Sequence, residues 1–414
     1  MTKKSDAPAI RFKGFSDAWE QRKLGDMMNV TSVKRIHQSD WTDSGVRFLR
    51  ARDIVAAAKN EEPDDYLYIS KEKYEEYSAL SGKVGVSDLL VTGVGTIGVP
   101  YLVRNLEPLY FKDGNIIWFQ NSDKIDGKFL FYSFSAEQIQ GFINESAGIG
   151  TVGTYTIESG KKTPISLPNQ IEQAKVGELF QQLDNLITLH QRKFEKLTNV
   201  KKSMLEKMFP QNGSSYPEIR FKGFTDPWEQ RKLGDIADIV GGGTPSTGNQ
   251  SYWDGDIDWY APAEIADQIY ANSSQKKITG LGYENSSAKM LPPGTVLFTS
   301  RAGIGKTAIL TRKGCTNQGF QSIVPHRGEL DSYFIFSRTE ELKRYGELVG
   351  AGSTFVEVSG KQMAVMELMM PPTMREQQTI GGFFQQLDNL ITLHQRELEK
   401  LQNIKKSMLE KMFV

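Results

Sequence analysis

The chain has 414 residues, enough for two or three domains, and 39% of them are hydrophobic, enough for ordinary cores. Its 50 lysines and arginines balance 50 aspartates and glutamates, so a nucleic-acid-binding role would need local basic patches or basic partners. One cysteine and four histidines exclude a disulfide framework and make a metal site unexpected, and the lack of a long apolar run or signal core predicts a cytoplasmic protein without a membrane span.

The first element in chain order is a short segment that occurs twice. The sequence IRFKGFSDAWEQRKLGD at 10–26 returns as IRFKGFTDPWEQRKLGD at 219–235, identical at 15 of 17 positions. Each copy contains a tryptophan, Trp19 or Trp228, preceded by two phenylalanines. We interpret these aromatic residues as the packing that starts a domain; the alternative is stacking on nucleic-acid bases.

Each copy is followed by a variable block, block X from 27 to about 165 and block Y from 236 to about 370. Both blocks have strand-like runs broken by glycine, then a helical segment, then a glycine-rich turn. The strands are expected at 46–54, 65–69, 88–103 and 114–119 in block X, and at 256–265, 294–310 and 317–325 in block Y. The plan is shared but the side chains differ, whereas the flanking repeats are nearly identical. We infer a constant scaffold that carries two exchangeable inserts, each recognising something different.

A second repeat follows each block. Residues 181–209 and 385–413 are identical at 25 of 29 positions, and their apolar residues have the three-and-four spacing of a helix. Asn169 with Glu172, and Thr373 with Glu376, have the spacing of capping boxes. The pattern predicts two helices about 60 Å long that pair as an antiparallel coiled coil, with glycines near their starts as weak points. The alternative is that each helix packs only on its own domain.

No motif in either block predicts catalysis. SRAGIGKT at 300–307 resembles a phosphate-binding loop, but Ser300 stands where that pattern requires glycine, and a turn between strands is the alternative. The signature of adenine methyltransferases is also missing. What remains are polar side chains on glycine-rich turns, of the kind that contact base edges, although each of them also fits a solvated surface position.

The candidate DNA-binding residues come from both blocks. In block X they are Arg47, Arg50, Arg52, Thr92, Thr96, Lys112, Asn115, Thr151, Tyr155 and Lys161. In block Y they are Thr299, Arg301, Lys306, Asn317, Gln318, Gln321, Ser353, Thr354 and Lys361.

Over nearly its whole length the chain resembles the specificity (S) subunits of type I restriction-modification systems. The resemblance is carried by WEQRKLGD before each block, by GGGTPS at 241–246, LFTSRAGIGKTAI at 297–309, TNQGF at 316–320 and GAGSTF at 350–355, and by the openings of the long helices. Block X departs from this pattern, with KDGNI in place of TNQGF and GIGTVGTY in place of GAGSTF.

The resemblance implies an α+β fold with two target-recognition domains, separated by two long antiparallel helices in a pseudo-twofold repeat. The expected divisions are a first recognition domain at 1–168, a first spacer helix at 169–209, a linker at 210–218, a second recognition domain at 219–372 and a second spacer helix at 373–414. Each domain is then expected to read half of a split double-stranded DNA site, with the helices setting the gap.

The resemblance also implies partners. Two methyltransferase (M) subunits would dock on the repeated regions and restriction (R) subunits would complete the nuclease. S-adenosylmethionine, ATP and magnesium would bind to those partners, and this chain would hold no cofactor, metal or catalytic residue. Two other hypotheses remain: a protein-only coiled-coil adaptor, and an enzyme that acts on nucleic acid by itself.

Overall fold

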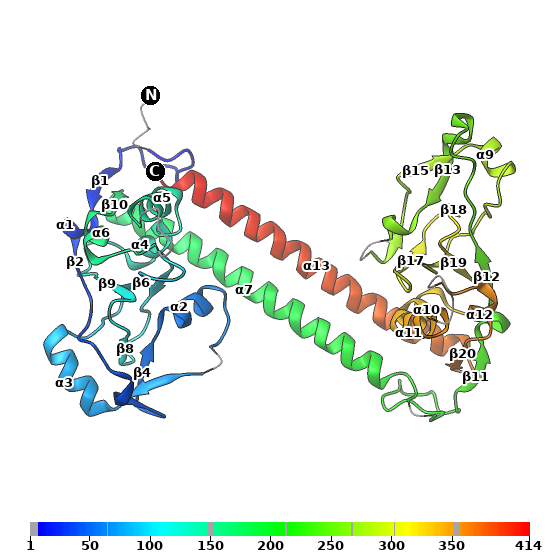
Figure 1. The fold of residues 1–414 in the computed structure, drawn as a ribbon, viewed down its shortest axis with the longest axis horizontal. Helices are drawn as coiled ribbons and strands as arrows, with labels where there is room; N and C mark the ends of the chain where they lie inside the picture. Colours follow the sequence, from blue (N-terminus) through cyan, green and yellow to red (C-terminus); the bar gives the residue numbers. More distant parts are fainter. Residues whose placement is uncertain are drawn as a thin grey trace. The chain divides into compact units, whose positions relative to one another are not determined.

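The computed structural model describes residues 7–63, 65–147, 153–211, 213–265, 268–301, 303–351 and 357–414. The chain divides into unit 1, with residues Met1–Arg192 and Gln395–Val414, and unit 2, with residues Lys193–His394. Helix α7 (Gln170–Lys207) therefore begins in unit 1 and ends in unit 2, and α13 (Met374–Met412) does the reverse (Figure 1). Among the described residues, no helix has the length and apolar character needed to cross a membrane.

Unit 1 has ten strands and seven short helices in its described part. The strands are β1 (Glu20–Lys23), β2 (Asn29–Thr31), β3 (Trp41–Thr42), β4 (Val46–Leu49), β5 (Leu67–Ile69), β6 (Leu89–Thr92), β7 (Pro100–Leu102), β8 (Leu109–Phe111), β9 (Ile116–Gln120) and β10 (Pro164–Leu167). The short helices are α1 (Leu24–Met27), η1 (Gln38–Asp40), α2 (Ala51–Ala58), α3 (Lys71–Ser81), α4 (Gly127–Ser133), α5 (Glu137–Ser146) and α6 (Ile157–Lys162). The sheet orders are β1-β10, β2-β9-β6-β7 and β3-β5-β4-β8.

Unit 2 repeats this plan. Its strands are β11 (Glu229–Lys232), β12 (Ala237–Gly241), β13 (Trp253–Tyr260), β14 (Tyr270–Ala271), β15 (Lys276–Ile278), β16 (Val296–Phe298), β17 (Thr307–Leu310), β18 (Cys315–Thr316), β19 (Gln321–Pro325) and β20 (Glu367–Met370). Its short helices are α8 (Leu233–Ile236), η2 (Gln250–Tyr252), η3 (Pro262–Glu264), α9 (Gly280–Glu284), α10 (Ser332–Ser337), α11 (Thr339–Gly350) and α12 (Gly360–Ala364). The sheet orders are β11-β20, β12-β19-β16-β17-β14 and β15-β13-β18.

The strand expected at 46–54 is wrong in its second half, because the chain turns into α2 after Leu49. Asp53 explains the change of structure. Its carboxylate accepts a hydrogen bond of 2.8 Å from the backbone N–H of Arg50, which satisfies a donor at the start of the helix. The Arg50 side chain also donates to Asp53, so local polar contacts favour a helix after Leu49.

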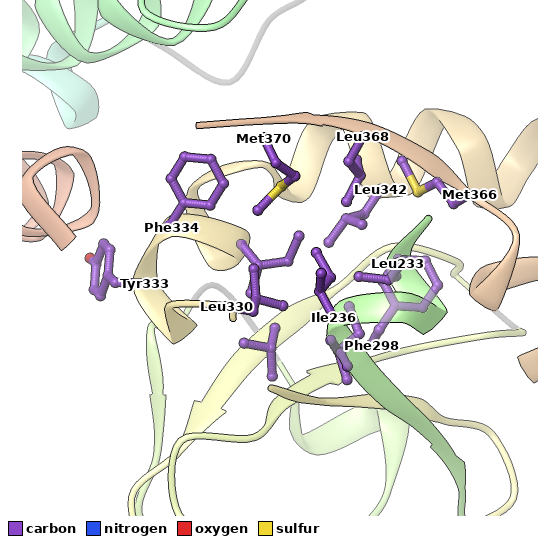
Figure 2. Packing of buried hydrophobic residues seen from close by; sticks show 14 of the residues in the cluster. Leu233, Ile236, Phe298, Leu330, Tyr333, Phe334, Leu342, Met366, Leu368 and Met370 are labelled. Carbon is purple, nitrogen blue, oxygen red and sulfur yellow. The ribbon is translucent and has the colours of Figure 1, made fainter. Parts of the chain in front are cut away.

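The repeated WEQRK segment joins the beginning of each variable block to its end. In unit 1, β1 pairs antiparallel with β10, and in unit 2, β11 pairs antiparallel with β20. Behind β11 the chain enters α8, whose Leu233 and Ile236 are fully buried. Figure 2 shows these two side chains packed with Phe298 of the sheet and with Leu342, Met366 and Leu368, in the main core of unit 2.

Each core is completed by the end of the long helix that terminates in that unit. Phe413 packs against Trp19, Phe129 and Phe180, with ring centroids 5.4 to 6.2 Å apart. In unit 2 the equivalent Phe209 packs in the same way against Trp228, Phe334 and Phe384. Trp19 and Trp228 are 5% and 2% exposed, so the interpretation of these residues as domain packing is confirmed and stacking on bases is excluded.

A buried ion pair holds the start of each long helix. Arg11 donates two hydrogen bonds to Glu172, at 2.6 and 2.7 Å, and Arg220 donates two to Glu376, at 2.7 and 2.8 Å. Of the two hydrogen bonds of each predicted capping box, only the one accepted by the cap side chain forms. Asn169 accepts from the backbone N–H of Glu172, but the glutamate side chain binds the arginine of the first repeat instead of turning back to the cap.

The two long helices run antiparallel in each unit, as two equivalent polar contacts demonstrate. In unit 1, Asp184 of α7 accepts a hydrogen bond from Tyr132 and pairs with Lys405 of α13 at 2.6 Å. Unit 2 contains the same arrangement, in which Asp388 bonds Tyr333 and pairs with Lys201 at 2.5 Å. Each helix thus packs on its own domain and on the other helix, so both packing modes considered from the sequence occur.

Gly177 and Gly381, expected from the sequence to be weak points of the helices, are sites of close packing. A Cβ on Gly381 would lie 2.7 Å from Oδ1 of Asp331 and 2.9 Å from the backbone nitrogen of Phe334. Gly177 meets the equivalent atoms of α4, at 2.8 and 2.9 Å. Glycine is therefore required because the long helix crosses the capped N-terminus of a short one. By contrast, a Cβ on Gly382 would meet nothing within 4 Å.

Substituting these adjacent glycines is expected to have opposite effects. Gly382→Ala should stabilise unit 2 by about 0.5–1 kcal/mol, since alanine loses less backbone entropy in a helix. Gly381→Ala should destabilise it by about 1–3 kcal/mol, because the methyl group would displace α10. Urea unfolding followed by tryptophan fluorescence measures both, and stabilisation by Gly381→Ala would contradict the close crossing.

Removing the buried charge of Glu376 should also be costly. Glu376→Gln leaves Arg220 largely buried without its anion, and we expect a loss of about 3 kcal/mol in the free energy of unfolding. Glu329→Gln is the matched control, because the pair of Glu329 with Arg231 is 2.7 Å long but solvent-exposed. The control should lose no more than about 1 kcal/mol. Equal losses in both variants would show that the buried pair has no special role.

Candidate nucleic-acid interface

Three loops meet at one edge of the main sheet of unit 2. They are the GGGTPS loop (241–246) after β12, the turn between β16 and β17, described at 299–301 and 303–306, and the TNQGF loop (316–320) before β19. Backbone hydrogen bonds join them: Gly243 N–H donates to Thr316 at 2.8 Å, and Ser300 N–H donates to Gly319 at 2.8 Å. This edge contains most of the described candidate residues of block Y.

Gly242 allows the first loop to touch the third, and Gly243 allows it to lie close to the segment at 287–288. A Cβ on Gly242 would lie 1.9 Å from the carbonyl oxygen of Asn317, and one on Gly243 would lie 2.3 Å from Oγ of Ser287. No other residue fits in that space without moving the neighbouring backbone. The GGG run of block Y therefore has a packing reason, and it fixes the position of the TNQGF loop.

Unit 1 has the same three loops with different residues. They are the segment 32–37 after β2, the turn at 92–99 between β6 and β7, and the segment 112–115 before β9. Gly93 N–H donates to the carbonyl of Asn115 at 2.7 Å, which matches the bond from Ser300 to Gly319. The bond from Lys112 N–H to Leu49, at 2.9 Å, likewise matches the bond from Asn317 N–H to Tyr260, at 3.0 Å. Between these two matched bonds unit 1 has Asp113 and Gly114 where unit 2 has Gln318 alone.

Thr92 and Thr299, both predicted to bind DNA, hold the central turn of each unit. Both are fully buried. Each hydroxyl accepts a backbone N–H seven residues on, at 2.9 Å, and donates to a carbonyl four residues on. Their hydrogen-bonding capacity is used inside the fold. The hydrogen bonds of residues 299–306 also confirm the turn and argue against a phosphate-binding loop.

Of the other block X candidates, the three arginines gather around Asp65 and Tyr66, and the rest lie apart from them. Arg50 is mostly buried and bonded to Asp53 and Asp65, and its hydrogen bond lowers the pKa of Asp65. Tyr155 is buried against Thr163, and burial raises the pKa of its hydroxyl. Arg52, Thr96 and Lys161 are exposed; Arg47 lies over a tyrosine ring, Lys112 lies near Trp41, and Asn115 is half-buried in its loop. Thr151 lies outside the described residues.

More of the block Y candidates are together. Arg301 donates to the carbonyl oxygen of Gln318 at 2.8 Å, and Asn317 accepts from the backbone N–H of Gly319 at 2.7 Å. Lys306 and Lys361 are exposed, and Gln321 is half-buried beside Gly360. Ser353 and Thr354 lie outside the described residues.

Two residues at this edge escaped prediction. In unit 2 the hydroxyl of Thr244 donates to the side-chain oxygen of Gln318. In unit 1, Arg35 donates from Nε to Asp113 at 2.8 Å. Both contacts join the loop after the first sheet strand to the loop before the last one, and we call each a loop clasp. Arg35 could not be predicted from the sequence, because the loop of block X that contains it lacks the GGGTPS motif.

The described part of the chain shows neither a metal site nor a reactive cysteine near these loops. It contains no group of three or more histidine, cysteine, aspartate or glutamate residues placed to hold a metal ion. Cys315 is buried, and burial raises the pKa of its thiol to about 11, so it stays protonated and unreactive near neutral pH. The edge presents amide, hydroxyl and guanidinium groups, which suit hydrogen bonding to a polar ligand.

Comparisons with known proteins agree with this arrangement. The family model described as type I restriction modification DNA specificity domain matches residues 16–199 and again 225–403. The MjaIX specificity subunit of Methanocaldococcus jannaschii, a type I restriction enzyme subunit, is 34% identical over 45% of this chain and 44% of its own length. The putative MjaX specificity subunit of the same organism is 25% identical over 94% of this chain and 92% of its own length.

A solved structure has the same fold. The crystal structure of the S subunit of a type I restriction-modification system from M. genitalium gives a TM-score of 0.63 at 13% identity, and the match covers 99% of both chains. Neither a protein-only adaptor nor a stand-alone nucleic-acid enzyme finds support among these relatives. Because the family model matches both halves, the chain belongs to the type I restriction modification DNA specificity family and is a non-catalytic DNA sequence-recognition subunit.

Proposed function

We propose that each unit reads one half of a bipartite double-stranded DNA site through the loop edge described above. The observation that carries the proposal is the combination of a common frame with different loop residues. The equivalent loops of the two units share backbone contacts, such as those of Gly93 with Asn115 and of Ser300 with Gly319, but the polar groups they present to solvent differ. Equal scaffolds with unequal contacts are what recognition of two different half-sites requires.

The helices α7 and α13 set the number of base pairs between the half-sites, because each begins in one unit and ends in the other. The chain provides recognition in the cytoplasm, and catalysis belongs to partners. Two M subunits and the R subunits bind S-adenosylmethionine, ATP and magnesium and complete the complex. The formal net charge of zero supports this division, since partners would provide part of the attraction to phosphate.

Exposed leucines on the repeated helices support two equivalent docking sites for the M subunits. Leu186 and Leu189 of α7 are 44% and 46% exposed, and the equivalent Leu390 and Leu393 of α13 are 44% and 51% exposed. Residues three apart share a helix face, so each pair forms a small apolar surface. Buried side chains are identical in the two repeats because they fill equivalent cores. This reason does not apply to the exposed leucines, which are identical in both repeats as well. A common partner explains their identity.

Exchange of block X tests the function directly. Replacing residues 27–165 with the block of another specificity subunit should change one half of the recognised site and leave the other half and the gap unchanged. Methylome sequencing of cells that carry the chimera and its M subunit measures both halves. The same exchange in block Y should change only the other half, and a simultaneous change of both halves would refute independent reading.

Polar substitution of the leucines should remove M subunits one at a time. Leu186→Gln with Leu189→Gln should reduce the complex from two M subunits to one, since glutamine keeps helix propensity but removes the apolar contact. Adding Leu390→Gln and Leu393→Gln should abolish assembly. Native mass spectrometry counts the subunits. Asn185→Ala and Asn389→Ala, at exposed positions of the same helices, are the controls, and full assembly of the fourfold variant would place docking elsewhere.

A further inference from the structure

We propose that the loop clasps contain specificity-determining residues: Gln318, positioned by Thr244, contacts an adenine in one half-site, and Arg35, positioned by Asp113, contacts a guanine in the other. This inference rests on the proposed function, because it names the bases that the two loop edges would read. Neither Arg35 nor Thr244 belongs to the residues expected from the sequence to bind DNA.

In unit 2 the clasp fixes an exposed amide. The backbone of Gln318 is held by the 2.8 Å hydrogen bond from Arg301 to its carbonyl oxygen, and its side-chain oxygen accepts from Thr244. The neighbouring Asn317 N–H donates to Tyr260 at 3.0 Å, which ties the loop to the buried end of β13. Gln318 itself remains exposed, and within the described part of the chain its Nε2 group donates no hydrogen bond.

In unit 1 an arginine occupies the matching place. The Arg35 side chain is 67% exposed, and its Nε donates to Asp113, which is only 14% exposed. The terminal amino groups of Arg35 make no hydrogen bond to any described residue. Where unit 2 has Gln318, this unit has Asp113 followed by Gly114, whose φ of 69° favours glycine. The amide of unit 2 therefore has no counterpart here, and the reading group comes from the opposite loop.

These groups match particular base edges in the major groove. A glutamine amide pairs with adenine by accepting from N6 and donating to N7. Because a carbonyl oxygen has two lone pairs, the Gln318 oxygen accepts from N6 while it also accepts from Thr244. An arginine presents its two terminal amino groups to O6 and N7 of guanine, and its Nε stays bonded to a carboxylate.

The second residue of each clasp, Thr244 or Asp113, positions the side chain that contacts the base. A free glutamine or arginine on a surface loses rotamer freedom when it binds, and a side chain already held by a neighbour loses less. The hydroxyl of Thr244 and the carboxylate of Asp113 restrain the reading group before DNA arrives. Arg35 and Gln318 are therefore expected to act on discrimination between bases, and not on the stability of the fold.

The test uses the complex of the full chain with its M subunit. Bound duplexes are selected from a pool in which both half-sites are randomised, and base preference is measured by sequencing. Gln318→Ala should remove an adenine preference at one position of one half-site, a loss of roughly tenfold to a hundredfold. Arg35→Ala should remove a guanine preference at one position of the other half-site, by a similar factor.

Variants of the positioning residue separate this role from a structural one. Thr244→Val should weaken the same adenine preference as Gln318→Ala, while Thr244→Ser, which keeps the hydroxyl, should retain it. Thr311→Val is the control, because Thr311 is an exposed threonine at the other end of β17 whose hydroxyl donates to the backbone carbonyl of Ala271 and not to a reading group. It should leave every base preference unchanged.

The outcomes are distinct. If the wild-type complex selects no split site, the proposed function itself fails. If it selects one, and the preferences of Gln318→Ala and Arg35→Ala equal those of the wild type, the inference about the clasps is overturned and the proposed function stands. A uniform loss of affinity at all positions, or an equal effect of Thr244→Val and Thr311→Val, also overturns it.

Discussion

The end of each long helix is part of the core of the unit in which it terminates. Phe413 fills the space between Trp19, Phe129 and Phe180, and Phe209 does the same beside Trp228 in unit 2. Neither unit has a complete core without a segment from the far end of a helix that began in the other unit. Folding of the two units is therefore linked through the covalent continuity of α7 and α13.

This constraint accounts for the near identity of the repeats. Residues of the first repeat contact the start of one helix and the end of the other, as Arg220 does with Glu376 and Trp228 with Phe209. Close approaches add to the constraint, because the helix at Gly381 leaves no room for a Cβ beside Asp331. A change at any of these positions disturbs a buried contact, so the frame has little freedom to vary.

The loop edge is under a different constraint. Its central turn is held by a buried threonine in both units, and the adjoining loops are joined by backbone hydrogen bonds. The exposed side chains of the clasps contribute little to the core, so Arg35 in one unit and Gln318 in the other are free to differ. A rigid frame with replaceable surface groups allows new specificity without loss of the fold.

The sequence by itself determined the duplication, the α+β class, the two long helices and the packing role of the tryptophans, because each depends on local patterns such as apolar periodicity and repeated segments. It also placed polar candidates of block Y on glycine-rich loops, most of which the fold brings to one edge of the main sheet. Only the tertiary structure decided which of these side chains are exposed and free to bind a ligand. Thr92 and Thr299 are buried, and Arg50 is bound to carboxylates, although all three have the residue types of DNA contacts.

Glu172, Glu376, Gly177 and Gly381 had local interpretations that the fold replaced, since their partners lie far away in sequence. The sequence did not mark Arg35 as a candidate, because its position opposite Asp113 follows from the pairing of β2 with β9. Local patterns specify secondary structure through contacts within a few residues. The exposure of a polar side chain instead depends on which distant segments pack against it, and that is set only when the strands have paired.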